Sequence, residues 1–205
     1  MSSSIATPMS SQAHALRQKE SAQVTLSARR TSSSGIWVGV FAITMSFAAF
    51  TSALFVREGT TDWGHLVLPP ILYVNTLFLL ASSGTLELAR RNLCSDARVS
   101  KAGAWVGITL MLGLGFCTGQ YRAWLDLREQ GIYLATNPNS SFFYVLTFMH
   151  ALHVLAGLLA LAYVVYRLST RQTAIRRSIF DNTAVYWHFM GLLWVYLLVL
   201  CRTKL

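Results

Sequence analysis

Five long hydrophobic stretches dominate the chain after residue 35. They cover about 36–56, 66–88, 103–121, 142–166 and 184–201. A helix rises about 1.5 Å per residue, so about 20 residues cross a hydrocarbon core roughly 30 Å thick. Helices are the expected form, because isolated strands would leave backbone groups without hydrogen bonds in lipid. The pattern predicts an all-α polytopic membrane protein, with a five-helix transmembrane bundle over residues 36–205.

Residues 1–35 are polar and contain ten serines, four basic residues and a single acid, Glu20. This segment has no apolar run of the length found in secretory signals. We expect a disordered tail that faces the cytoplasm. A segment rich in Ser and Arg and poor in acids also fits an organellar transit peptide, so cleavage of the tail stays open.

The composition supports a membrane protein. Hydrophobic residues make up 54% of the chain and charged residues only 12%. Soluble domains contain roughly a quarter charged residues, so this chain has too few to cover a soluble surface. The 12% of aromatic residues excludes a disordered chain.

The basic residues behind the net charge of +9 are concentrated on one side of the predicted membrane topology. The tail and the segments between the second and third and the fourth and fifth stretches hold 12 Lys and Arg, whereas the other side holds 5. The positive-inside rule therefore places the N-terminus in the cytoplasm or matrix and the C-terminus outside. This basicity suits anionic lipid, and no nucleic-acid partner is expected.

Catalytic motifs are missing from the sequence. None of the eight acids falls at the middle of a predicted span, and no phosphate loop or CxxC occurs. The three cysteines, at 94, 117 and 201, are expected to be unpaired. We therefore expect no catalytic centre and no metal on this chain. A secondary transporter is not favoured, because the sequence has no inverted repeat or polar broken helix.

Histidine is the one residue type that suggests a cofactor. His150 and His153 lie three residues apart on the fourth stretch, and His188 lies near the start of the fifth. One interpretation is axial haem ligation through His153 or His188. The other is hydrogen bonding between helices or to a headgroup. The predicted depths favour hydrogen bonding, because His188 lies near the inner surface and axial ligands share one depth.

Several motifs appear in a specific order across four of the stretches. They are Leu68–Pro70 leading to Asn75 and Thr76; Gly119 and Gln120 with Trp124; Phe142 and Phe143 leading to His150, Ala151, Leu152 and His153; and Tyr186, Trp187 and His188 with Trp194. Together they resemble subunit III of haem-copper oxidases of the cytochrome c oxidase type. The resemblance covers about residues 36–200, in the short five-helix bacterial form.

The resemblance implies a non-catalytic core subunit of an oxygen-reducing, proton-translocating complex. Such a subunit packs on subunit I, shares the complex with subunit II and small subunits, retains phospholipid, and stabilises turnover and proton uptake. Haem and copper are then expected in the partner subunits. Arg167, just after the fourth stretch, matches a family arginine that contacts lipid headgroups, and Arg171 follows it. A guanidinium suits a phosphate, although snorkelling also explains such an arginine.

The implied location is the bacterial inner membrane, with the mitochondrial inner membrane as the alternative. Alternative functions are a subunit III-like partner of a quinol oxidase or a nitric oxide reductase, or a stand-alone membrane haem protein. The chain also departs from the family: Ser46, Ala123 and Gly191 stand where an acid is usual. Buried acids are normally retained for a role, so these changes argue against a proton-antenna role.

Overall fold

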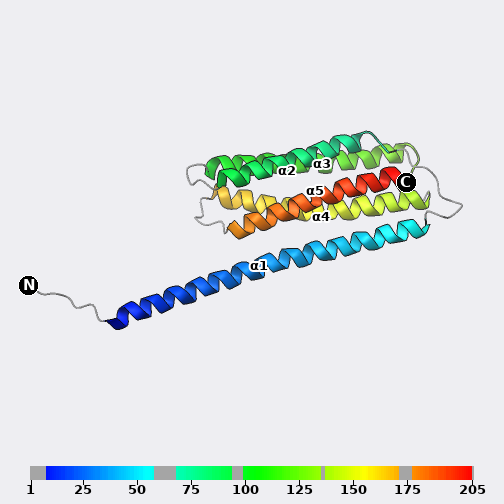
Figure 1. Ribbon diagram of the computed structural model, residues 1–205. Coiled ribbons are helices and arrows are strands. Elements are labelled where there is room, and N and C mark those ends of the chain that lie inside the picture. The colour runs from blue at the N-terminus through cyan, green and yellow to red at the C-terminus, as the bar shows by residue number, and fades with distance from the viewer. Residues whose placement is uncertain (1–7, 58–67, 94–98, 135–136, 171–176, 205) are drawn as a thin grey trace, which may run out of the picture.

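The computed structural model describes residues 8–57, 68–93, 99–134, 137–170 and 177–204. These residues form five helices and no strand (Figure 1). The helices are α1 (Pro8–Arg57), α2 (Ile71–Leu93), α3 (Val99–Glu129), α4 (Pro138–Ser169) and α5 (Arg177–Lys204). Each helix contains all or most of one predicted hydrophobic stretch, so the all-α, five-helix prediction is confirmed.

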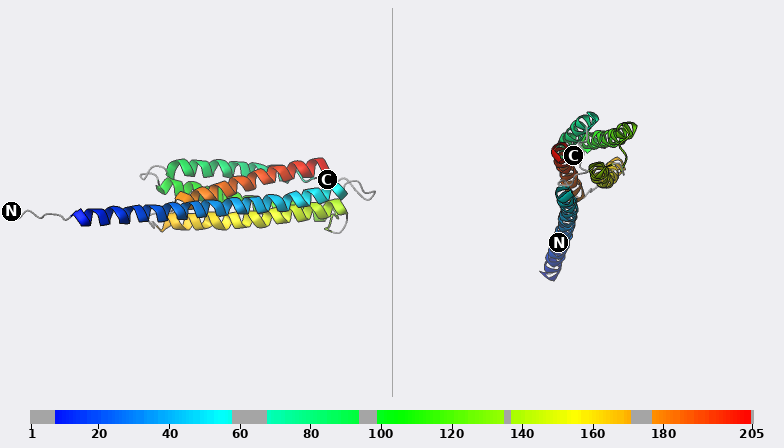
Figure 2. Two further views of the ribbon diagram at one scale, coloured as in Figure 1. Left: turned by 60° about the horizontal axis from the view of Figure 1, so that its bottom comes forward. Right: turned by 90° about the vertical axis from the view of Figure 1, so that its right-hand side faces the viewer.

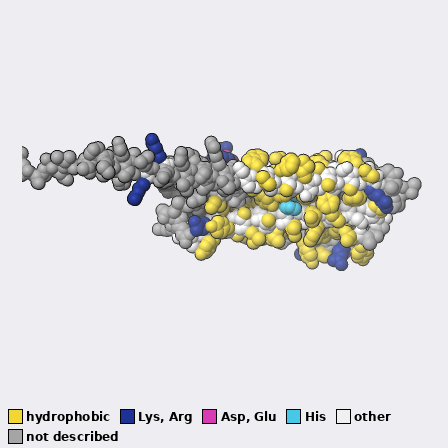
Figure 3. Space-filling model, turned by 90° about the horizontal axis from the view of Figure 1, so that it is seen from below, with side chains coloured by type: hydrophobic (Ala, Val, Ile, Leu, Met, Phe, Trp, Pro, Cys, Tyr) yellow, Lys and Arg dark blue, Asp and Glu magenta, His cyan; other side chains and the backbone are white. Residues whose placement is uncertain are grey.

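All five helices are long and apolar enough to span a membrane. The candidate spans are Ser34–Arg57, Ile71–Asn92, Lys101–Glu129, Pro138–Ser169 and Ile179–Lys204. Figure 3 shows one face of the molecule, where hydrophobic side chains cover the length of the bundle and Lys and Arg side chains lie toward its ends. This distribution matches a bundle whose middle faces lipid. The chain is a multi-pass membrane protein.

The helices pack around α5. Within the described residues, α5 contacts α1, α2 and α4, while α3 contacts α2 and α4. Helix α1 lies along one side of the bundle and packs on α4 and α5 (Figures 1 and 2). The N-terminal part of α1 projects beyond the other helices, and the C-terminus lies at the opposite end of the bundle (Figure 1).

The N-terminal segment differs from its prediction. The sequence suggests a disordered tail over residues 1–35, but α1 is continuous from Pro8 to Arg57. No Gly or further Pro occurs between Pro8 and Gly35, and Pro8 itself occupies the first helical turn, where proline is well tolerated. Once the membrane span forms a helix, extending it by one residue adds one hydrogen bond without a new nucleation cost. Residues 1–7 lie outside the described part.

The other helices also extend past their hydrophobic stretches. Helix α2 begins at Ile71, so Pro69 and Pro70, which belong to the predicted stretch 66–88, precede the helix. Helix α3 continues two turns beyond Tyr121 to Glu129. Gly131 follows the helix end, and its φ of 77° allows the Ile132 N–H to reach the Leu127 carbonyl over 3.0 Å. This is a glycine-terminated helix end of the Schellman type.

The core is built from seams of buried residues spaced three or four apart. On α2 and α5 the pattern is unbroken over four turns or more. The buried residues are Leu72, Asn75, Leu79, Ser82, Leu86 and Ala89 on α2, and Phe180, Ala184, Trp187, Met190, Trp194, Leu197 and Cys201 on α5. This spacing is that of left-handed helix packing, with seam residues of one helix inserted between those of the next. It directs the motif residues into the bundle.

Candidate functional site

The residues that the sequence motifs single out lie mainly on these seams. Asn75, Gln120, His150, Trp187 and Trp194 are buried, whereas Thr76, Trp124, His153 and His188 are partly buried. They come from α2, α3, α4 and α5, which the packing brings together. The motif residues are therefore far apart in the chain but lie together inside the bundle, and the motif tryptophans make separate hydrogen bonds between helices.

Three tryptophan side chains connect the helices through their indole N–H groups. Trp194 on α5 donates to Thr76 Oγ1 on α2 over 3.0 Å. Trp187, about two helical turns earlier on α5, donates to Ser82 Oγ on α2 over 2.9 Å. Trp124 on α3 donates to Thr147 Oγ1 on α4 over 3.1 Å. A buried indole N–H needs an acceptor, so each bond fixes both the rotamer of the tryptophan and the register of two helices.

Glycines provide the space for Trp187. A Cβ added at Gly113 would lie 2.8 Å from the Trp187 ring and 2.7 Å from Leu158, and one at Gly157 would lie 3.1 Å from the Trp187 ring. Helices α3 and α4 therefore each place a glycine against the indole. Small residues of this kind let helices approach closely in membranes, where packing is a main source of stability.

Asn75, Gln120 and His150 form an unusual polar set. The side chains of Asn75 and His150 are fully buried and Gln120 is 2% exposed. Each of these three side chains has two polar atoms, and none of these atoms has a hydrogen-bond partner among the described residues. Most buried polar groups are hydrogen-bonded, because leaving one unpaired costs roughly 1–3 kcal/mol. This set therefore needs an explanation.

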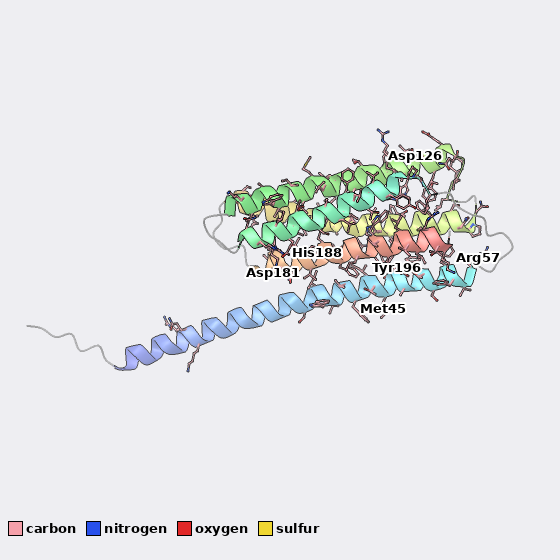
Figure 4. The ribbon with its side chains drawn as sticks, turned by 45° about the horizontal axis from the view of Figure 1, so that its top comes forward. Met45, Arg57, Asp126, Asp181, His188 and Tyr196 are labelled. Atoms are coloured by element: carbon pink, nitrogen blue, oxygen red, sulfur yellow. The ribbon has the colours of Figure 1, made fainter. Side chains whose placement is uncertain are left out.

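His153 and His188 contact different parts of the bundle. The His153 Nδ1–H donates to the Met149 carbonyl of its own helix over 2.6 Å, and its ring lies edge-on to Phe47 of α1. His188 lies within electrostatic range of Glu87 and Arg90 at the end of α2. Figure 4 shows His188 and Asp181 near the start of α5. The described contacts thus place the two histidines in different parts of the bundle.

An ion-pair cluster that sequence reasoning missed joins α2 to α5. The Arg90 guanidinium lies 3.4 Å from Asp181 and 3.7 Å from Glu87, and Glu87 also lies 3.3 Å from Arg91. Helical spacing of three and four residues could have indicated the pairs within α2. The Arg90–Asp181 pair gives no such signal, because its partners are distant in the sequence.

Of the two arginines expected to bind lipid, the structure describes Arg167. Arg167 is partly buried at the end of α4, with its guanidinium 5.9 Å from the centre of the Tyr163 ring. Arg171 lies outside the described residues.

Among the described residues, no group of three or more His, Cys, Asp or Glu side chains is arranged to hold a metal ion.

The three positions that lack a family acid also differ. Ser46 is exposed on α1 and donates to the Ala42 carbonyl of its own helix over 3.0 Å. Ala123 is fully buried on α3. Gly191 is buried on α5, where an added Cβ would lie 3.5 Å from Ser83 Oγ. Two of these sites are therefore interior and one faces the surroundings of the bundle.

The fold and its interior network define a multi-pass membrane protein whose polar motif residues mostly face the inside of the bundle. Residues 32–202 match the family described as Cytochrome c oxidase subunit III. The chain belongs to this family, the subunit III of haem-copper oxidases.

Individual relatives agree with the family. The chain is 36% identical to cytochrome c oxidase subunit 3 of Synechocystis sp. over 172 residues, which cover 82% of this chain and 69% of the relative. It is 33% identical to cytochrome c oxidase subunit 3 of Corynebacterium diphtheriae, covering 76% and 79% of the two chains. It is 30% identical to quinol oxidase subunit 3 of Bacillus subtilis, covering 80% and 82%.

Proposed function

We propose that this subunit III is a non-catalytic core subunit of a terminal oxidase in aerobic electron transport. It packs against the catalytic subunit I within the membrane and shares the complex with subunit II. Haem and copper are held by those partners, and this chain binds neither. Its contribution is to hold the complex together and to keep turnover and proton uptake stable.

The hydrogen bonds that three motif tryptophans make between helices are the observation that carries this proposal. The motif tryptophans Trp124, Trp187 and Trp194 donate to hydroxyl groups on neighbouring helices. These tryptophans lock helices to one another, which is the arrangement that a rigid scaffold requires. The His153 side chain instead bonds a carbonyl of its own helix. A cofactor site would instead present several ligating groups to one shared space.

Retained phospholipid is the second part of the proposal. Arg167 stands at the end of α4 with its guanidinium beside the Tyr163 ring. An arginine held by an aromatic ring at a helix end can form two parallel hydrogen bonds with a phosphate. Arg171 is the second basic residue proposed to contact a headgroup.

The orientation follows from charge. The side of the N-terminal segment carries 12 Lys and Arg and the opposite side 5, which supports an N-terminus inside and a C-terminus outside. The relatives reported above are from bacteria, which supports the bacterial inner membrane as the location. In that membrane the C-terminal end of α5 faces the periplasmic or external side.

The electron donor is proposed to be cytochrome c. The relatives from Synechocystis sp. and Corynebacterium diphtheriae carry the name cytochrome c oxidase, whereas that from Bacillus subtilis is named a quinol oxidase. The quinol oxidase is therefore the second candidate. Because subunit III binds neither donor in this proposal, the distinction belongs to the partner subunits.

Affinity purification of the tagged chain from membranes in mild detergent tests these points together. We expect subunits I and II to co-purify, and the complex to oxidise reduced cytochrome c while it consumes oxygen. Oxidation of quinol alone would identify the second candidate. A stoichiometric haem absorption band that remains with the chain after its partners are removed would contradict the proposal.

A further inference from the structure

The three unpaired polar side chains lie at one level of the bundle. Asn75 on α2 is pressed against α3 at Gly119, where an added Cβ would lie only 1.9 Å from Asn75 Oδ1. Gln120 is the next residue along α3 and belongs to the buried seam of that helix. Asn75 therefore lies at the same level of the bundle as Gln120 on α3.

Ring contacts connect His150 to the same level. Phe116, one turn before Gln120 on α3, lies edge-on to His150 with ring centres 5.9 Å apart. Trp194 lies 5.2 Å from His150 and 4.9 Å from Phe116 between ring centres. The Trp194 indole donates to Thr76, the neighbour of Asn75. The contacts thus run from α2 through α3 and α4 to α5 and back to α2.

Apolar side chains separate this level from the ends of the bundle. Leu72 and Leu79 lie one turn to either side of Asn75 on α2, and both are buried. Val154 on α4 is likewise fully buried, one turn after His150. The amide and imidazole groups are consequently buried between apolar layers, where a polar group without a hydrogen-bond partner is unfavourable.

The chemistry of the three groups selects the ligand. Each amide offers N–H donors and a carbonyl acceptor, and a neutral imidazole offers one donor and one acceptor. A cation would satisfy only the acceptors, and an anion only the donors. Water both donates and accepts, and buried waters typically make about three hydrogen bonds to polar groups that lack other partners.

We propose that Asn75, Gln120 and His150 form a binding site for ordered water inside the transmembrane bundle of this subunit. The bound water completes the hydrogen bonds of the three side chains and couples α2, α3 and α4. The need to seat the Asn75 amide beside the α3 backbone explains the glycine at position 119. The proposal does not depend on the electron donor of the complex or on lipid binding.

High-resolution electron cryomicroscopy of the purified complex tests the site directly. We expect density for at least one water within hydrogen-bond distance of two or more of the three side chains. Direct hydrogen bonds among Asn75, Gln120 and His150 with no density between them would overturn the proposal. Apolar side chains packed directly against the three polar groups, with no density for water beside them, would also overturn the proposal.

Infrared spectroscopy supplies an independent measurement on the same complex. Exchange into H₂¹⁸O should shift an O–H stretching band of the wild-type complex, and this isotope-sensitive band should be lost in Gln120→Leu. Ser46→Ala, which removes an exposed hydroxyl on α1, is the matched control and should keep the band. Retention of the same isotope-sensitive bands in Gln120→Leu would contradict the site. If Gln120→Leu fails to assemble, the cryomicroscopy result on the wild-type complex decides.

Discussion

Trp194 and Thr76 are 118 positions apart in the chain, yet the indole N–H of Trp194 donates to Thr76 Oγ1 over 3.0 Å. The Thr76 hydroxyl in turn donates to the Leu72 carbonyl of its own helix over 2.9 Å. One hydroxyl therefore connects the indole of α5 to the backbone of α2. Because both ends are fixed, this pair specifies how far α5 can slide along α2.

Replacing Trp194 with Phe should weaken this connection. The substitution removes one buried hydrogen bond and part of the indole volume, so we expect a loss of about 1–2 kcal/mol in the free energy of unfolding. Trp37→Phe is the control, because Trp37 is 60% exposed on α1. Thermal or denaturant unfolding of the purified complex measures both. Equal stability of the two variants would show that the Trp194–Thr76 bond contributes nothing.

The helices could be predicted from the sequence, because each span is a continuous apolar stretch. The partners of the inward residues could not. Nothing near Trp187 indicates that its N–H bonds Ser82, which is 105 residues away. The acceptor is chosen by the rotation and register of two helices, and these depend on the packing of the whole bundle.

The polar groups illustrate the same limit in another way. The histidine spacing drew attention to His150 and His153, but not to their different surroundings. His150 lies beside the rings of Phe116 and Trp194, whereas His153 bonds its own helix. The extension of α1 back to Pro8 was missed because a serine-rich polar segment suggests disorder. Its lack of internal Gly and Pro was the available signal.

Gly119→Ala should destabilise the bundle. The new Cβ would lie 1.9 Å from Asn75 Oδ1, so the Asn75 side chain or α3 must move. Such overpacking typically costs about 1–3 kcal/mol. Gly115→Ala on the same helix is the matched control, because no atom lies within 4 Å of its added Cβ and alanine favours a helix. The melting temperature should fall for Gly119→Ala alone. A fall of similar size in both variants would mean that the Asn75 contact is not the cause.

The double variant Gly119→Ala with Asn75→Ala should recover part of the lost stability. Removing the Asn75 amide relieves the collision that the new methyl group creates. A double-mutant cycle measures this coupling in the free energy of unfolding. Purely additive losses would show that the two positions do not collide.

Asp181→Asn should have only a small effect on stability. The Arg90–Asp181 pair is about half exposed, with side-chain exposures of 54% and 42%, and Arg90 also pairs with Glu87. Exposed ion pairs contribute about 0–1 kcal/mol and are screened by salt. The difference between variant and wild type should shrink further as salt is added during thermal unfolding. A loss as large as that of Gly119→Ala would instead indicate a buried, structural role for this pair.

The proposed orientation predicts where each helix end is accessible. A periplasmically active reporter, such as alkaline phosphatase, should be active when fused after Lys204 and inactive when fused after Arg91 at the end of α2. The excess of Lys and Arg on the side of the N-terminal segment, 12 against 5, is the physical reason. Expression of each fusion is checked by immunoblot. If well-expressed fusions show the opposite activities, the orientation of the chain is the reverse of the one proposed.

Arg167→Ala should lower the amount of anionic phospholipid that stays with the purified complex. The guanidinium beside the Tyr163 ring is the group proposed to bind a headgroup phosphate, and alanine removes both its charge and its paired donors. Arg167→Lys keeps the charge and should retain an intermediate amount, because an ammonium cannot form the same two parallel bonds. Lys101→Ala removes an exposed charge on the same side of the membrane and controls for general electrostatic attraction. Native mass spectrometry counts the bound lipids, and prolonged oxygen consumption reports the lifetime of the complex. Lipid counts and lifetimes that match the Lys101→Ala control would remove Arg167 from the proposed lipid site.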